Sequence, residues 1–362
     1  MTTDNGKNVF LIGPGLIGAD LLELLHADGY HVTTMARRES HAAQLREFGA
    51  NVKTIIGTLD DKDMITKHTA EVPIVIHAAT ADHLPSVEAV LDGIRQRADK
   101  GLSTTFLHTS GTSELVDNSK GMYASDKIYT DLDPGDIDAS VPDTAPHREI
   151  DLAILRGRKE IGSKAKIVII LPPLIYGVGR RIPRLTIQLP TMTRFALKHG
   201  YAPVIGKGVS IRCSIHVQDL VRAYMVILNW LSATSGEEVL ENPYFFCDSG
   251  TEMTWGEGAA EIGKALHAAG KIESPEPRNP PKELYGDLFG PYTPTTVGAN
   301  SRSRAERLRK MGWEATEKGV FESLREDEIP MILAEWEKDG KDFAGYTGVA
   351  SSGTHVLESL RD

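Results

Sequence analysis

Cysteine is scarce in this sequence, with two residues among 362, Cys213 and Cys247. Two thiols cannot form a disulfide framework, and their separation matches no metal-binding motif. We therefore expect neither a disulfide scaffold nor a metal site. A chain of this kind suits a reducing compartment, and we expect it in the cytoplasm.

An excess of basic residues is also lacking, because 40 Lys and Arg stand against 50 Asp and Glu, for a formal net charge of −10. Such a chain offers no extended cationic surface to nucleic acid. No apolar run approaches the ~20 residues of a membrane-spanning helix. We expect a globular protein that acts on a small molecule and has neither nucleic acid nor a membrane as partner.

A glycine-rich turn stands near the N-terminus. Residues 9–12 form an apolar run typical of a buried strand, and an amphipathic helical pattern leads to a second strand at 31–35. Between the first strand and the helix lie Gly13, Gly15 and Gly18. This spacing lets the backbone approach a pyrophosphate at a helix N-terminus. The unit predicts a dinucleotide site, and the alternative is a glycine turn without a ligand.

Arg37 and Arg38 follow the second strand, where NAD-binding chains usually carry an acidic residue for the ribose. Two guanidinium groups suit a 2′-phosphate instead. The sequence therefore favours NADP(H) over NAD(H). The alternative is that both arginines are simply solvated on a loop.

Further strands are expected at 52–57, 73–80 and 103–111, with helical patterns at 60–70 and 84–99. Strands that alternate with helices predict an α/β fold, a Rossmann-type doubly wound parallel sheet. In such a sheet the ligand lies at the carboxyl ends of the strands.

Two domains are expected. Residues 1–175 would form the NADP-binding Rossmann domain, with an inserted loop at 111–147. Residues 176–362 would form mainly a smaller C-terminal substrate lobe, with a part at about 205–250 returning to the first domain. We expect the long acidic loop to cover the site, and the alternative is a solvated surface loop.

Several stretches in the right order resemble a known superfamily. They include "LIGPGLIG" (11–18), "GTLDD" (57–61), "VIHAAT" (75–80), "FLHTSGT" (106–112) and "ILPPLIYGVG" (170–179). The chain resembles the short-chain dehydrogenases/reductases, and within them the extended NAD(P)-dependent epimerase/dehydratase branch. Ile12 stands where that branch usually has its first glycine, and Cys213 where it often has an aspartate. The resemblance is therefore to an atypical member.

The resemblance implies a set of site residues. Those for the cofactor are Gly13, Gly15, Leu16, Ile17, Gly18, Arg37, Arg38, Leu59, Ala78, Ala79, Thr80 and Pro173. Ser110 is implied to orient the substrate oxygen. Arg212 lies in the segment that resembles the substrate-binding arginine, and the alternative is a surface salt bridge. His216 and Asp219 fit a turn and a helix cap better than a catalytic role.

In this superfamily a tyrosine acts as acid and base, with a lysine four positions later, and Tyr123 and Lys127 have that spacing. The pair precedes the amphipathic helix expected at 147–162, where the resemblance would place it. Ser125 is a good helix cap and Pro134 is expected to end any helix that begins there. Either the pair acts from the inserted loop, or another group takes its place.

His147 and Tyr176 are the alternative acid/base groups, since an imidazole titrates near neutrality. As ordinary structure, His147 would be a helix-entry residue and Tyr176 a packed aromatic. We expect an NADP-dependent oxidoreductase acting on a carbonyl or alcohol of a small organic molecule. The alternatives are an epimerase, isomerase or lyase that does not consume NADP, and a non-catalytic NADP-binding regulator. The resemblance is also compatible with a homodimer.

Overall fold

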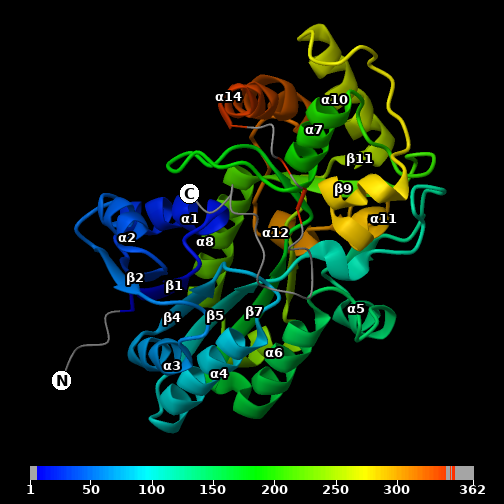
Figure 1. Cartoon of the computed structure of the whole chain (residues 1–362). Helices are drawn as coiled ribbons and strands as arrows, with labels where there is room; N and C mark the ends of the chain where they lie inside the picture. The colour runs from blue at the N-terminus through cyan, green and yellow to red at the C-terminus, as the bar shows by residue number, and fades with distance from the viewer. Residues whose placement is uncertain (1–5, 340–342, 344, 347–362) are drawn as a thin grey trace.

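The computed structural model describes residues 6–339, 343 and 345–346 of the chain. Two lobes lie side by side, a larger one built on a parallel sheet and a smaller one rich in helices (Figure 1). Within the described residues, no helix is long and apolar enough to cross a membrane.

The larger lobe holds a seven-stranded parallel sheet. Across the sheet the strands are β10 (Tyr244–Phe246), β7 (Ala165–Leu171), β5 (Thr104–Thr109), β4 (Ile74–His77), β1 (Asn8–Ile12), β2 (His31–Ala36) and β3 (Val52–Ile56). The order reverses between β1 and β4, as in a doubly wound sheet. The predicted Rossmann-type fold is confirmed.

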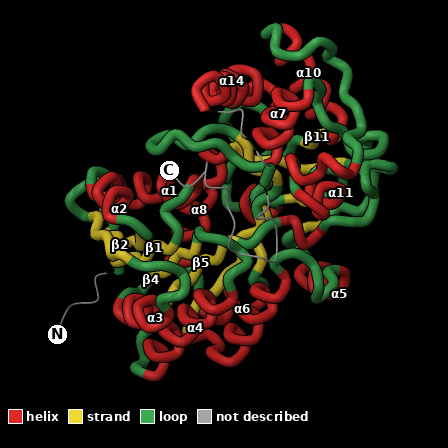
Figure 2. The backbone as a smooth tube through the Cα atoms, viewed as in Figure 1, coloured by secondary structure: helices red, strands yellow, loops and turns green. Residues whose placement is uncertain are grey.

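Helices cover both faces of this sheet (Figures 1 and 2). One face carries α1 (Leu16–Ala27), α2 (Glu39–Arg46) and α8 (Val217–Ala233), and the other carries α3 (Lys62–Glu71), α4 (Leu84–Asp99) and α6 (Arg148–Ile161). The central strands are almost entirely buried because both faces are covered. Helix α6 buries Ile150, Ile154 and Ile161, the apolar face that the sequence predicted.

The smaller lobe has its own apolar core, which includes Phe195 and Trp255. A three-stranded sheet runs through it, formed by β8 (Leu174–Tyr176), β9 (Ile211–His216) and β11 (Glu252–Thr254). The principal helices around it are α7 (Gln188–His199), α10 (Trp255–Ala268) and α14 (Ile329–Asp339). The chain passes back into the larger lobe at α8 and β10.

The segment between β5 and α6 has structure of its own. It contains the turn η1 (Thr112–Leu115), the strand β6 (Tyr129–Thr130), which pairs with β12 (Ser303–Arg304), and the helix α5 (Pro134–Ser140). The expectation that Pro134 ends a helix was wrong, because Pro134 begins one. The Asp133 side chain accepts a hydrogen bond from the Asp136 amide at 3.1 Å, and proline is well suited to the first position of a helix.

Short elements complete the fold. They are η2 (Gly162–Lys164), α9 (Gly236–Glu241), η3 (Lys282–Asp287), η4 (Gly290–Tyr292), α11 (Thr293–Thr296), α12 (Glu306–Lys310), α13 (Val320–Ser323) and η5 (Leu324–Glu328).

Candidate functional site

The glycine turn between β1 and α1 packs against the end of β4. Gly13 has φ of +91°, and a Cβ there would lie 2.4 Å from the Ala79 amide nitrogen. A Cβ at Gly18 would lie 2.1 Å from the Gly13 carbonyl oxygen. Only glycine fits at these two positions, and Ala78 and Ala79 leave room for the turn beside them.

The N-terminus of α1 is open to an anion. Gly15 caps the helix without a side-chain hydrogen bond, and the first turn, which begins with Leu16 and Ile17, holds no acidic residue. The first amides of a helix and its dipole favour a negative group. This end of the helix therefore fits the pyrophosphate of a dinucleotide.

Cationic side chains gather beyond the end of β2. Arg37 and Arg38 are exposed there. Burial and the charges of Arg184, Arg38 and Arg37 lower the pKa of His41, so the three guanidinium groups lie near one another. Glu39, the acidic residue next to Arg38, forms an ion pair with Arg46 of α2.

Arg184 belongs to a segment that we call the strap, residues 177–187 between β8 and α7. The strap doubles back on itself, with a bridge between Val178 and Leu185, and reaches from the smaller lobe over α1 as a green loop in Figure 1. The Arg180 and Arg181 amides donate to the Asp20 carboxylate of α1, at 3.0 and 3.2 Å. Burial and the charges of Arg37 and Arg38 lower the pKa of Arg184, so the strap brings Arg184 near the end of β2.

Ser110 lies at the end of β5, where the sequence predicted it. Its Oγ donates a hydrogen bond to Glu114 Oε1 at 2.9 Å, and both side chains are buried. Glu114 stands in η1, and Arg148 Nη1 lies 3.5 Å from its other oxygen. The hydroxyl is thereby held in one orientation.

A buried carboxyl and a buried imidazole lie behind Ser110. Burial and the neighbouring Glu114 raise the pKa of Asp151 well above its ordinary value. Burial, with the charges of His77 and His147, holds the pKa of His108 well below its ordinary range. In both groups burial disfavours the charged form.

His147 precedes α6 and faces the same edge of the sheet. Its φ of +68° is in the left-handed region, which is uncommon for a residue with a side chain. Its Nδ1 lies 2.7 Å from Asp82 Oδ1, in the loop after β4, and the two side chains are 14% and 7% exposed. A Cβ at Gly111 would lie 3.6 Å from His147 Nε2, so the imidazole lies beside the residue that follows Ser110.

Tyr123 and Lys127 do not lie together on a helix. The chain between Gly121 and Ile128 is irregular, and the Tyr123 side chain is half-exposed. Lys127 Nζ binds Asp136 at 2.6 Å, whereas the nearby charge of Asp117 raises the pKa of Tyr123. The two side chains therefore have different carboxylate partners, and the structure brings neither to Ser110 by a described contact.

Tyr176 packs in the smaller lobe with an exposure of 2%, and its hydroxyl donates to the Lys318 carbonyl at 2.9 Å. Burial first, and then the charges of nearby carboxylates, raise its pKa far above the usual range. Tyr176 is therefore the packed aromatic residue that the sequence analysis gave as the alternative to an acid/base role. His216 caps α8 through Nδ1, which accepts from the Gln218 amide at 3.1 Å, as expected.

Arg212 is buried in β9, which corrects the surface salt bridge offered as its alternative. Its Nε and Nη1 have no hydrogen-bond partner among the described residues, and burial lowers its pKa to about 10. Its bridge partner is Ser301, whose hydroxyl donates to the Thr112 carbonyl at 2.7 Å. Arg212 is therefore linked through Ser301 to η1, the turn that follows Ser110.

The remaining predicted cofactor residues lie at the same edge of the sheet. Thr80 Oγ1 accepts from the Asp82 amide at 3.2 Å, and Pro173 is buried just after β7. Leu59 is half-buried after β3. The sequence reasoning missed Asp20, Asp82, Glu114 and Arg184, although Asp82 stands two residues after Thr80 and could have been noted there.

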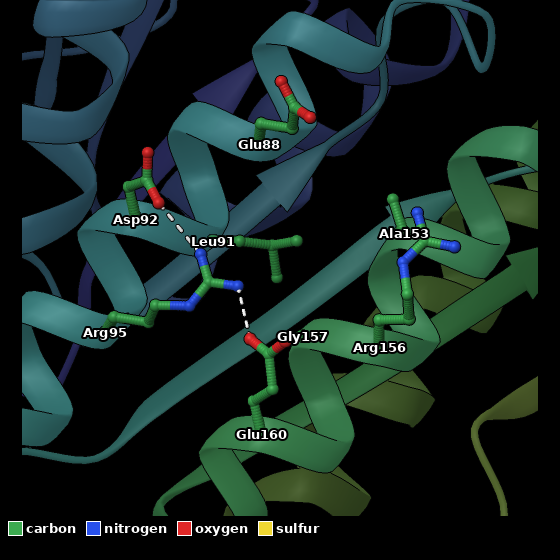
Figure 3. Close-up of a pocket in the computed structure, with 8 residues that line it drawn as sticks. All are labelled: Glu88, Leu91, Asp92, Arg95, Ala153, Arg156, Gly157 and Glu160. Atoms are coloured by element: carbon green, nitrogen blue, oxygen red, sulfur yellow. Dashed lines mark hydrogen bonds and ion pairs between the residues drawn. The ribbon is translucent and has the colours of Figure 1, made fainter.

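A polar groove of about 300 Å³ lies elsewhere, between α4 and α6 (Figure 3). Arg95 spans it, with hydrogen bonds of 2.8 Å to Asp92 and to Glu160. None of the predicted site residues lines this groove. It is a surface of paired charges, separate from the candidate site.

Comparison with known proteins identifies the family to which this chain is similar. Residues 10–240 match the model of the "NAD dependent epimerase/dehydratase family". The sequence is 27% identical over 286 residues to an oxidase, ucsJ, of an Acremonium species, covering 74% of this chain and 81% of that protein. It is 23% identical over 324 residues to an uncharacterized protein of Saccharomyces cerevisiae, covering 88% and 97%.

Solved structures of similar fold include a UDP-glucose 4-epimerase of Thermotoga maritima. It has a TM-score of 0.61 and 15% identity, with 91% of this chain and 100% of that chain covered. A yeast methylglyoxal/isovaleraldehyde reductase complexed with NADPH has a TM-score of 0.56 and 15% identity, with 91% and 99% covered. At these identities the likeness shows the shared fold.

Proposed function

This chain belongs to the NAD dependent epimerase/dehydratase family, and we propose that it is an NADP-dependent oxidoreductase. The proposed substrate is the carbonyl or alcohol group of a small organic molecule. A nicotinamide dinucleotide fits the glycine turn and the open N-terminus of α1, whereas the preference for NADP rests on the charges beyond β2.

The observation that carries the proposal is the group of Arg37, Arg38 and Arg184. The three guanidinium groups come from two segments, and burial together with the charges of Arg184, Arg38 and Arg37 lowers the pKa of His41 among them. Guanidinium groups bind phosphate oxygens through paired, charge-assisted hydrogen bonds. A 2′-phosphate at the end of β2 would suit this group, and a plain ribose hydroxyl would bring no charge for it to bind.

Ser110 and Arg212 are the residues that we expect at the substrate. Ser110 has a hydroxyl hydrogen-bonded to Glu114 at the carboxyl edge of the sheet, and Arg212 has buried N–H groups with no hydrogen-bond partner in the described part of the chain. A substrate oxygen bound by Arg212 would satisfy those donors. The nicotinamide, when bound, supplies hydride chemistry, while these side chains bind and orient the substrate.

Two relatives lend support to redox chemistry. One is named an oxidase, and a structural neighbour is a reductase bound to NADPH. The neighbours also include epimerases and dehydratases, so the assay must separate net redox chemistry from reactions that leave the cofactor unchanged.

The test uses the purified full chain, first for NADPH and NADH affinity by fluorescence and then for NADPH oxidation across a panel of aldehydes and ketones. We expect the double variant R37A/R38A to weaken NADPH binding by about tenfold to a hundredfold, since a charge-assisted contact contributes about 1.5–3 kcal/mol. NADH affinity should change little. Arg95→Ala, in the groove between α4 and α6, is the matched control.

The outcomes separate the alternatives. Equal affinity for NADPH and NADH in the unmodified protein would refute the cofactor preference. Product formation without net NADPH oxidation would assign an isomerase, epimerase or lyase. Tight NADPH binding without turnover of any compound would favour a regulator.

A further inference from the structure

We propose that His147, held by Asp82, is the group that transfers the proton during carbonyl reduction. The inference rests on the proposed oxidoreductase function and adds the proton donor that it requires. His147 is then a catalytic residue, and Asp82 is a positioning residue.

The first support is the location of His147. It precedes α6 at the carboxyl edge of the sheet, and its ring lies against Gly111, directly after Ser110. Its partner Asp82 follows β4, two residues after Thr80 in the stretch that packs beside the glycine turn. The pair therefore spans the strand ends between the nucleotide turn and the serine.

The second support is the state of the imidazole. A carboxylate oxygen only accepts hydrogen bonds, so the 2.7 Å contact with Asp82 requires the proton of a neutral His147 ring to be on Nδ1. Nε2 is then free to accept a proton and, once protonated, to donate one. This nitrogen is the one that faces Gly111.

The third support is the backbone. The φ of +68° at His147 is a conformation that costs free energy for a residue with a Cβ. The His147 side chain makes no cap hydrogen bond to α6 that would account for it. In this conformation the ring contacts Asp82 on one side and lies beside Gly111.

Other titratable groups nearby are less suited to the task. His108 is fully buried, its ring nitrogens make no hydrogen bond to the residues that the structure describes, and burial holds its pKa well below the ordinary value. Asp151 is also fully buried, and burial together with the neighbouring Glu114 raises its pKa. Tyr346 faces Asp82 from the C-terminal segment, and burial together with the Asp82 charge raises its pKa. His147 is the member of this group that combines a carboxylate partner at 2.7 Å with some exposure of its side chain.

The step balances as follows. Carbonyl reduction needs a hydride at carbon, which carries two electrons, and a proton at oxygen. The hydride comes from the reduced cofactor, the N–H bond at His147 Nε2 breaks, and an O–H bond forms on the product alcohol. The neutral imidazole then regains a proton from water. In the oxidation direction the same nitrogen accepts the alcohol proton.

The test is His147→Gly, chosen because glycine adopts positive φ without strain and should preserve the backbone. We expect kcat for NADPH-dependent reduction to fall by about 10²–10⁴-fold, the usual contribution of general acid catalysis. NADPH affinity and the melting temperature should stay near their original values. Added imidazole should restore part of kcat by filling the space left by the ring. Asp82→Asn should lower kcat without raising KM, and imidazole should not restore it.

The outcomes are distinguishable from failure of the proposed function. If the unmodified enzyme reduces no member of the panel, the proposed function and this inference both fail. If it does and His147→Gly keeps its kcat, only the inference is overturned. Loss of kcat in Tyr123→Phe, with full activity in His147→Gly, would assign the proton transfer to the inserted loop. A drop in His147→Gly that imidazole does not relieve would assign His147 a structural role.

Discussion

Replacing Glu328 by glutamine tests whether a buried carboxyl limits stability at neutral pH. Glu328 stands in η5, before α14, and its Oε1 accepts a hydrogen bond from the Gly177 amide at 3.1 Å. The side chain is fully buried. Burial raises its pKa from 4.5 to about 7, although the Gly177 amide works in the opposite direction. Glutamine keeps an oxygen for that amide and removes the ionisable group.

The direction of the effect follows from the two pKa values. Below pH 4.5 the carboxyl is protonated in both the folded and the unfolded chain, so its ionisation does not affect stability. Between pH 4.5 and about 7 the unfolded chain ionises first, and stability falls by about 1.4 kcal/mol per pH unit. Above about 7 the loss stays constant, at about 3 kcal/mol.

The assay is urea unfolding of the unmodified protein and of Glu328→Gln at pH 5 and pH 8. We expect the stability of the variant relative to the unmodified protein to rise by about 2–3 kcal/mol between these pH values. Glu322→Gln, at an exposed position of α13, is the control and should show little change. An equal stability difference at both pH values would refute the assignment of a raised pKa to Glu328.

Two further predictions concern the glycine turn and the smaller lobe. Gly18→Ala should weaken NADPH binding more than tenfold, because the added Cβ would collide with the Gly13 carbonyl. Fluorescence titration measures this affinity. Gly319→Ala is the control and should bind NADPH normally, because its Cβ would meet nothing within 4 Å. Glu252→Gln should lower the free energy of unfolding at pH 7 by about 1–3 kcal/mol. Burial would raise the pKa of Glu252, but hydrogen bonds from Arg302 and Arg304 outweigh it and lower the pKa to about 2. The stabilisation by ionised Glu252 is present above pH 4.5 and is lost as the pH falls toward 2. Unfolding curves should therefore show a smaller stability difference between the unmodified protein and Glu252→Gln at pH 4 than at pH 7.

The sheet and the glycine turn were predictable because their signals are local. The apolar run at 9–12 and the spacing of Gly13, Gly15 and Gly18 lie within one βαβ unit, whose geometry follows from periodicity. The same holds for α6, whose apolar face was visible in the sequence. Pro134 shows the limit of local reasoning, since proline can begin a helix as well as end one.

The chemistry of the candidate site was harder to predict because its contacts join distant segments. His147 meets Asp82 across 65 residues, and Arg184 reaches the arginines after β2 from another lobe. A spacing rule detects pairs on one helix, so it selected Tyr123 and Lys127. Nothing in the sequence around His147 reveals its positive φ or its carboxylate partner.

The Asp20 carboxylate has a consequence for motion between the lobes. It accepts from two strap amides and from the Gln218 side chain of α8, while it is 2% exposed. Pulling the strap away would leave a buried charge short of donors, at a cost of several kcal/mol. A motion of the lobes that keeps these bonds costs less, so we expect the strap to move together with α1 rather than separate from it.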